Sequence, residues 1–345
     1  MIRLTWLQFR GQALLAAAAL ALIAVILGAA APHLFHLYAT SGVATCQAHG
    51  DCVPLATSLV NELPGFYGIL YFVGIGVLFV VPVLIGAFWG APLVSREYET
   101  GTFRLAWTQD ITRGRWLAVK LGVIGLASMA TAGLFSLLLT WWSGPIDTAA
   151  GLKEGNSITF IRLGLVLFAA RDITPVAYAA FAFALGVTAG VLIRRTVPAM
   201  AATLAVFAAV QIAWALVIRQ HLLAPARIIV ALSSADLGSL GEGPGNSMFV
   251  TAPATATRPG DWLLSTQTID RAGHVLNVTN VKPCLGPHVQ ACQAALGTMH
   301  LRDVITYQPA SRFWAFQWYE SAIFLALAVA LAGFSAWWLS HHRVG

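Results

Sequence analysis

Long apolar segments recur along this chain and constrain its fold more than any other feature. A helix needs about 20 mostly apolar residues to cross the hydrocarbon core of a bilayer, which is ~30 Å thick. Because 58% of the residues are hydrophobic and 10% are charged, the composition is not that of a soluble globular domain. We predict an all-α polytopic membrane protein with six transmembrane helices. They cover about 13–31, 66–93, 117–142, 173–193, 197–218 and 314–339.

The N-terminal segment combines basic and apolar residues. In residues 1–12, Arg3 and Arg10 lie beside large apolar side chains, as in a helix that rests in the membrane interface. The alanine-rich run that ends at Ala31 also resembles a signal peptide with a small-residue cleavage site. We expect this segment to be retained as an N-terminal interfacial elbow helix that leads into the first span.

The predicted topology puts both termini in the cytoplasm. Short inner segments, such as the turn at Arg194 and Arg195, are denser in basic residues than the longer outer segments. Residues 158–170 are apolar apart from Arg162, but a helix of that length is too short to cross a bilayer. We therefore predict a helix in the outer interface there. If it crossed, every later span would reverse its direction.

The longest polar segment, 219–312, lies between the fifth and sixth spans. Gly, Pro, Ser and Thr crowd residues 233–260, which indicates loops. A turn near Asp270 to Gly273, between two β-prone runs, predicts a β-hairpin. We predict a small α+β extracytoplasmic insertion that disulfides stabilise. The chain then divides into a membrane domain (1–218), this insertion (219–312), and the sixth span with a cytoplasmic tail (313–345).

All four cysteines fall in predicted outer loops, where an oxidising compartment favours disulfides. Four cysteines allow three pairings, and the short spacings favour two local bridges, Cys46 with Cys52 and Cys284 with Cys292. His288 lies midway between the second pair, so a metal site is the alternative. Because two cysteines and one histidine are an incomplete zinc ligand set, we predict disulfides and no metal.

The sequence shows no pattern of a nucleotide-binding or catalytic site. It has no phosphate-binding loop ending in Gly-Lys-Ser/Thr, no His-Glu metalloprotease helix and no Gly-x-Ser-x-Gly elbow. Ionisable residues near the spans are few: Glu320 lies at the start of the last span, and Arg171 and Asp172 precede the fourth. At these positions we expect local pairing rather than an ion relay. The formal net charge of +6 suits topology and anionic lipids better than nucleic acid.

The segment from Ser95 to Lys120 is the main concentration of charge between two spans. A helix over Glu97–Gln109 would place aromatic residues on a membrane-facing side and leave charged side chains exposed to a partner. Glu97 and Glu99 would complement the dipole at its start, and Gly101 would permit close backbone approach. The alternative is an ordinary charged inner loop. Because no other segment binds nucleotide or relays ions, we infer that energy for any transport arrives here from another polypeptide.

The run of Glu97, Glu99, Gly101 and Thr102 after the second span, followed by a basic-aromatic exit, resembles the cytoplasmic segment of ABC-2-type permeases. These proteins are the membrane subunits of ATP-binding-cassette exporters. The six-span architecture agrees, and residues 307–314 are similar to actinobacterial members, although the 219–312 segment is larger than in many relatives. The resemblance implies a coupling helix that docks on a nucleotide-binding subunit. The residues that it assigns to coupling are Arg96, Glu97, Glu99, Gly101, Thr102, Arg104, Gln109 and Arg113.

The resemblance implies a permease subunit without catalytic residues, in a bacterial plasma membrane. Two nucleotide-binding subunits would bind ATP and Mg, and the membrane part would hold two copies of this chain or one copy with a homologous permease. Spans one, two and five would line a cavity for an amphipathic or hydrophobic substrate such as a drug, antibiotic, peptide or lipid. Gln211 and Trp214 are candidate lining residues, although such residues in a span also serve helix packing.

Two other functions remain open. The chain could be a membrane sensor that works with an ABC ATPase and binds a ligand through 219–312. It could also be an integral membrane enzyme with an outer active site. The enzyme would need a clustered nucleophile and base, which the scattered residues His274, His288 and His300 do not provide.

Overall fold

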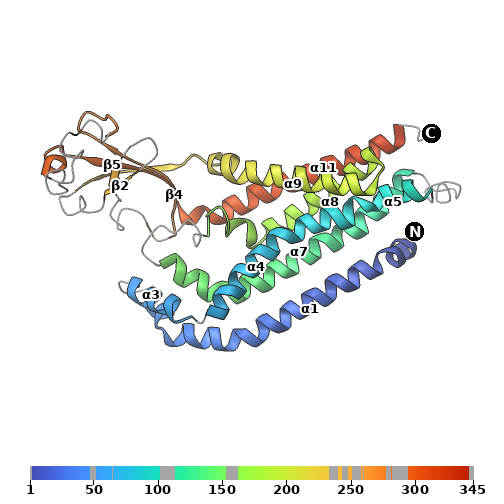
Figure 1. Cartoon of the computed structure of the whole chain (residues 1–345), viewed down its shortest axis with the longest axis horizontal. Helices are drawn as coiled ribbons and strands as arrows, with labels where there is room; N and C mark the ends of the chain where they lie inside the picture. Colours follow the sequence, from blue (N-terminus) through green and yellow to red (C-terminus); the bar gives the residue numbers. More distant parts are fainter. Residues whose placement is uncertain are drawn as a thin grey trace.

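The helices of this protein lie side by side in an elongated bundle, and a small β-sheet projects from one end (Figure 1). The N- and C-termini and the end of α5 (Pro92–Thr100) lie at the opposite end. Both termini therefore share one end of the bundle with the charged segment, as the predicted topology requires. The computed structural model describes residues 2–46, 52–63, 65–101, 113–152, 162–232, 240–242, 248–250, 258, 260–276, 281 and 294–341.

In the part of the chain that the structure describes, six helices are long and apolar enough to cross a membrane, which agrees with the predicted number of spans. Most extend beyond the apolar runs, because a helix ends where its backbone hydrogen bonding ends and not where its hydrophobicity does. Their bounds are α1 (Ile2–Thr40), α4 (Gly65–Leu84) continued by the π-helical turn η1 (Ile85–Gly90) into α5, α7 (Arg113–Leu152), α8 (Thr174–Ile193), α9 (Thr196–Ala213) continued by η3 (Trp214–Ile218) and η4 (Arg219–His221), and α11 (Phe313–His341).

The N-terminal segment differs from the prediction. α1 is one continuous helix from Ile2 to Thr40, so the elbow helix is not a separate element. The helix packs against α7 and leaves apolar side chains such as Leu14 and Leu15 exposed along its length. A helix that is apolar on its outer face is suited to contact with lipid.

The prediction of an interfacial helix at 158–170 is wrong for the part that the structure describes. Residues 162–167 form turns and η2 (Phe168–Ala170) is a single 3₁₀ turn. Leu163 and Phe168 are buried, and they pack with Trp262 and the first residues of α11. Hydrophobicity alone does not distinguish a side chain that faces lipid from one that packs against other protein segments. The apolar run was for that reason wrongly predicted to lie in the membrane interface.

α8 occupies the centre of the bundle, and most of its side chains are buried. It crosses η1 at very short range because glycines face each other. A Cβ atom at Gly186 would lie 2.1 Å from the carbonyl oxygen of Gly86, and one at Gly90 would lie 2.5 Å from that of Phe183. Gly86 and Gly90 lie four residues apart, and the absence of a side chain at both positions permits this close approach, as in the small-residue pattern of membrane helix packing.

The described part of the segment between α9 and α11 contains a three-stranded antiparallel sheet in the order β1–β5–β4. The predicted hairpin turn is confirmed: the Gly273 N–H donates to the Asp270 carbonyl, and Ile269 pairs with Val275. The main partner of β4, however, is β5, which lies more than thirty residues away in the sequence and was not predicted. The strands are β1 (Ala226–Ala231), β4 (Trp262–Ile269) and β5 (Arg302–Gln308), with a separate pair of β2 (Leu240–Glu242) and β3 (Met248–Val250).

A disulfide joins Cys46 and Cys52, as predicted, with their Cα atoms 5.6 Å apart. It connects α2 (Val43–Cys46) to α3 (Val53–Glu62) at the same end of the bundle as the sheet. Cys284 and Cys292 lie outside the described residues, so their pairing stays a prediction.

We expect no free thiol in the oxidised protein, because the short spacing between Cys284 and Cys292 favours a second local bridge. Alkylation of unfolded, unreduced protein should label none of the four cysteines, and digestion should release a peptide linked through Cys284 and Cys292. A Cys46→Ser/Cys52→Ser variant serves as the control, because it leaves only the second pair. Labelling of that variant before reduction would contradict the second bridge.

Candidate functional site

The two flanks of the charged segment are joined by an ion pair. Glu97, on α5, accepts a hydrogen bond from Lys120, on α7, and both side chains are mostly buried. The Lys120 ammonium also lies 4.4 Å from the centre of the Trp116 ring. Because either charge would be left without its partner if the other were removed, the pair fixes the end of α5 relative to the start of α7.

Glu99 connects the same flank to the turn between α8 and α9. Its carboxylate oxygens accept hydrogen bonds from the Thr196 backbone N–H at 2.9 Å and from the Thr196 hydroxyl at 2.7 Å. Thr196 is the first residue of α9, where backbone N–H groups lack helical acceptors, so the carboxylate caps α9. The turn itself consists of Arg194 and Arg195, which confirms the predicted tight connection. The Arg194 guanidinium lies 5.8 Å from the centre of the Tyr98 ring.

Gly101 ends α5, so a single helix over Glu97–Gln109 is a wrong prediction. Gly101 has φ +71°, a left-handed conformation that glycine adopts without steric cost, and its N–H donates to the Tyr98 carbonyl. A Cβ atom there would meet no other atom within 4 Å. The glycine is therefore required by the backbone conformation and not by a close approach.

The structure describes only part of the predicted coupling set. Arg96 is exposed on α5, and Arg113 is the first residue of α7, although its side chain lies outside the described part. Thr102, Arg104 and Gln109 lie outside the described residues. In the described residues, α5 is bonded to α7 through Glu97 and to α9 through Glu99. A displacement of α5 would therefore act on both helices.

At the other end of the bundle, a buried charge pair lies between α7 and the segment before α8. The Asp147 carboxylate accepts two hydrogen bonds from Arg171, with Nε–Oδ2 at 2.9 Å and Nη2–Oδ1 at 3.2 Å. The hydroxyls of Tyr71 and Ser143 donate to the same carboxylate at 2.6 and 2.9 Å. Asp147 belongs to a predicted outer loop, but α7 continues to Leu152 and buries it.

A second buried pair joins the ends of α9 and α11. Arg219 and Glu320 form two hydrogen bonds of 2.9 Å, and neither side chain is exposed. The Tyr178 hydroxyl bonds to Glu320, and the Arg219 guanidinium lies 4.5 Å from the centre of the Phe168 ring. The expected local pairing of Glu320 is confirmed. The partner was missed because position 219 was predicted to begin the polar outer segment.

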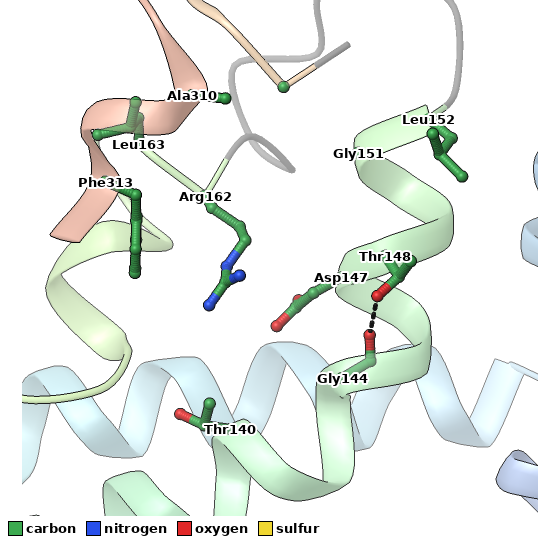
Figure 2. Close-up of a pocket in the computed structure, with 11 residues that line it drawn as sticks. Thr140, Gly144, Asp147, Thr148, Gly151, Leu152, Arg162, Leu163, Ala310 and Phe313 are labelled. Carbon is green, nitrogen blue, oxygen red and sulfur yellow. Dashed lines mark hydrogen bonds between the residues drawn. The ribbon is translucent and has the colours of Figure 1, made fainter. Parts of the chain in front are cut away.

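A cavity of about 410 Å³ adjoins the first of these pairs. It lies between the last turns of α7, the segment at Arg162 and the start of α11 (Figure 2). The Arg162 guanidinium points into the space between Phe313 and Asp147, and it pairs with Asp172 at 3.4 Å. Burial raises the pKa of Asp172, and the guanidiniums of Arg162 and Arg171 oppose that rise. No feature of the sequence taken alone indicated this cavity, because its walls come from four separate segments.

The two predicted substrate-cavity residues lie on α9 and its continuation. Trp214 is buried, and its ring packs edge-on against Phe324 at 4.9 Å. Neither Gln211 nor Trp214 lines the cavity at Arg162. Their role in a substrate path stays a prediction. In the part of the chain that the structure describes, no group of three or more potential metal ligands occurs.

Comparison with known families identifies one match. A family model described as ABC-2 membrane transporter related matches residues 17–219, which is more than half of the chain. The matched region covers most of the first and fifth spanning helices, and all of the three between them, the charged segment and the turn at Arg194. Searches of curated proteins and of solved structures found no significant match to the chain.

Proposed function

This chain belongs to the ABC-2 membrane transporter related family, and we propose that it is the permease subunit of an ATP-driven exporter. The family and the six apolar helices make it a multi-pass membrane component of a transport system. Coupling to an ATPase, direction of transport and substrate belong to the proposal. The single observation that supports coupling most is the attachment of α5 to both α7 and α9 through Glu97 and Glu99.

The proposed mechanism is mechanical. A nucleotide-binding subunit that closes on ATP pushes the segment after α5, and the push passes through Glu97 to α7 and through Glu99 to α9. Close packing of α8 against η1 and α5 makes these helices respond as a unit, because a packed interface transmits displacement. The chain itself then needs no catalytic residue, since ATP and Mg would be bound by the partner.

The proposed assembly contains two nucleotide-binding subunits and two permeases, either two copies of this chain or one copy with a homologous permease. We place it in a bacterial plasma membrane with both termini in the cytoplasm, where an ATPase has access to ATP. The exposed apolar side chains on α1 and α4 would contact lipid or the second permease. The substrate class that suits these apolar spans is an amphipathic or hydrophobic molecule.

Copurification with the cognate ABC ATPase tests this proposal. A variant with Glu97→Ala, Glu99→Ala and Gly101→Ala should recover about a tenth or less of the ATPase bound by the original chain, because roughly 1.4 kcal/mol of lost contact lowers affinity tenfold. ATP-driven export of a fluorescent amphiphile from vesicles should fall in parallel. The matched control is Glu62→Ala, an exposed carboxylate on α3 at the opposite end of the bundle.

The stability of the triple variant must be measured in the same preparation, because Glu97 and Glu99 also hold helices together. A conservative Glu97→Gln/Glu99→Gln variant keeps hydrogen bonds while removing charge, and we expect it to weaken ATPase binding with a smaller loss of thermal stability. ATPase recovery and export that are unchanged in all of these variants would refute docking at this segment.

A further inference from the structure

The cavity at the outer end of the bundle has the size of a ligand site. Its volume of about 410 Å³ falls within the range of roughly 300–1,000 Å³ that small-molecule pockets occupy. Its walls are α7 from Thr140 onward, the segment at Arg162 and Leu163, Gly260 before β4, and the beginning of α11 at Phe313 (Figure 2). The family role proposed above does not use it, because the charged segment lies at the other end of the bundle.

One wall of the cavity presents the Arg162 guanidinium, which has more hydrogen-bond donors than it uses with the described residues. A guanidinium has five N–H donors, and for Arg162 the described residues provide one acceptor, Asp172, at 3.4 Å. That distance exceeds the 2.7–2.9 Å of a strong charge-assisted bond, and the Arg162 side chain is 48% exposed. Its guanidinium carbon lies 4.5 Å from the centre of the Phe313 ring, which supports the flat face of the group. Arg162 is therefore oriented toward the cavity but only weakly neutralised.

The opposite wall does not compete for this cation. Both oxygens of Asp147 already accept hydrogen bonds from Tyr71, Ser143 and Arg171, and Arg171 balances its charge. Among the described residues that line the cavity, Arg162 is therefore the cation that an acidic ligand group would meet. The rest of the lining includes apolar side chains, among them Leu152, Leu163 and Phe313, which would bury an apolar body.

We propose that this cavity binds an amphipathic anion, with its acidic group at Arg162 and its apolar part against Phe313, Leu163 and Leu152. The ligand is either an acidic phospholipid from the bilayer or a water-borne amphiphilic carboxylate, which share this chemistry. Asp172 is the built-in competitor, because it holds the same guanidinium when the ligand is absent. Binding at this cavity requires no ATPase, so it can be measured on this chain alone.

The test uses the full chain purified in detergent and two kinds of probe. One arm titrates a dansylated fatty acid and its uncharged methyl ester, followed by fluorescence. The other arm counts phosphatidylglycerol and phosphatidylcholine molecules that remain bound in native mass spectrometry. We expect the acid to bind at least about tenfold more tightly than the ester, or phosphatidylglycerol to be retained in preference to phosphatidylcholine, since a charge-assisted bond contributes roughly a tenfold factor or more. The arm that responds identifies the source of the ligand.

Two substitutions should act in opposite directions. Arg162→Gln removes the cation and should weaken acid binding about tenfold. Asp172→Asn removes the competitor and should strengthen binding severalfold. Asn suits position 172, because the residue has φ 56°, a left-handed conformation that Asn tolerates better than most residues. The backbone contacts of residue 172 with Ser136 and Thr140 are retained in this variant.

The control is Arg271→Gln, which replaces an exposed arginine in the hairpin turn after β4, outside the cavity. It should change neither the affinity for the dansylated acid nor the number of bound phosphatidylglycerol molecules. Thermal stability of each variant is measured alongside, and if Arg162→Gln fails to fold, Asp172→Asn alone decides the direction. The proposal is overturned if charged and uncharged probes bind equally in both arms. It is also overturned if Arg162→Gln binds as well as the original chain, or if Asp172→Asn does not bind more tightly.

Discussion

Replacing Glu320 with alanine is expected to lower the free energy of unfolding by roughly 3–5 kcal/mol, because a buried arginine would lose its counter-charge. Glu320 and Arg219 are both fully buried and share two hydrogen bonds of 2.9 Å. Without the carboxylate, the described residues would leave the guanidinium the carbonyl of Leu165 at 3.3 Å, the Tyr178 hydroxyl at 3.2 Å and the face of the Phe168 ring. Neither neutral oxygen balances a full positive charge.

Thermal unfolding in detergent measures this loss. At roughly 2–4 °C per kcal/mol, the midpoint Tm should fall by at least about 6 °C. The double variant Arg219→Met/Glu320→Leu removes both charges together, and it should recover most of the lost stability because apolar side chains suit this site. Glu62→Ala, an exposed carboxylate, is the control and should stay within about 0.5 kcal/mol of the original. A Glu320→Ala protein as stable as the original would mean that the pair does not hold the helices together.

Adding one methyl group at Gly186 is expected to disrupt the centre of the bundle. The new Cβ atom in Gly186→Ala would lie 2.1 Å from the Gly86 carbonyl oxygen and 2.8 Å from the Ala91 nitrogen. These are backbone atoms, so no side-chain rotation relieves the overlap, and α8 must separate from η1. Overpacking of a core costs roughly 1–3 kcal/mol, and more where backbone must move, so we expect a loss of about 3 kcal/mol or more.

Size-exclusion profiles and Tm values of the purified protein would show this effect as a lower monodisperse yield and a lower midpoint. Gly76→Ala is the matched control, because Gly76 lies in α4 and a Cβ atom there meets nothing within 4 Å. That change should be neutral or stabilising by up to ~1 kcal/mol, since alanine favours the helix. Equal behaviour of the two variants would mean that α8 and η1 are not in close contact in the membrane.

The correct predictions from sequence concern properties that short segments carry by themselves. Each apolar run is long enough to form a spanning helix without reference to any other part, so six helices were predicted correctly. The turn at Asp270 to Gly273 and the bridge from Cys46 to Cys52 are likewise local, because both ends lie a few residues apart.

Only the tertiary structure decided which distant residues meet. Glu320 needs a counter-charge, which any nearby cation could provide. Its partner is Arg219, 101 residues away in the sequence, because the packing of α9 and α11 brings the two side chains together. The pairing of β4 with β5 and the cavity at Arg162 depend in the same way on segments far apart in the chain. The sequence by itself determined that this is a multi-pass membrane protein, because transfer of apolar residues into a bilayer depends on local composition. The positions of its buried charges and its cavity depend on contacts between helices, which no single segment specifies.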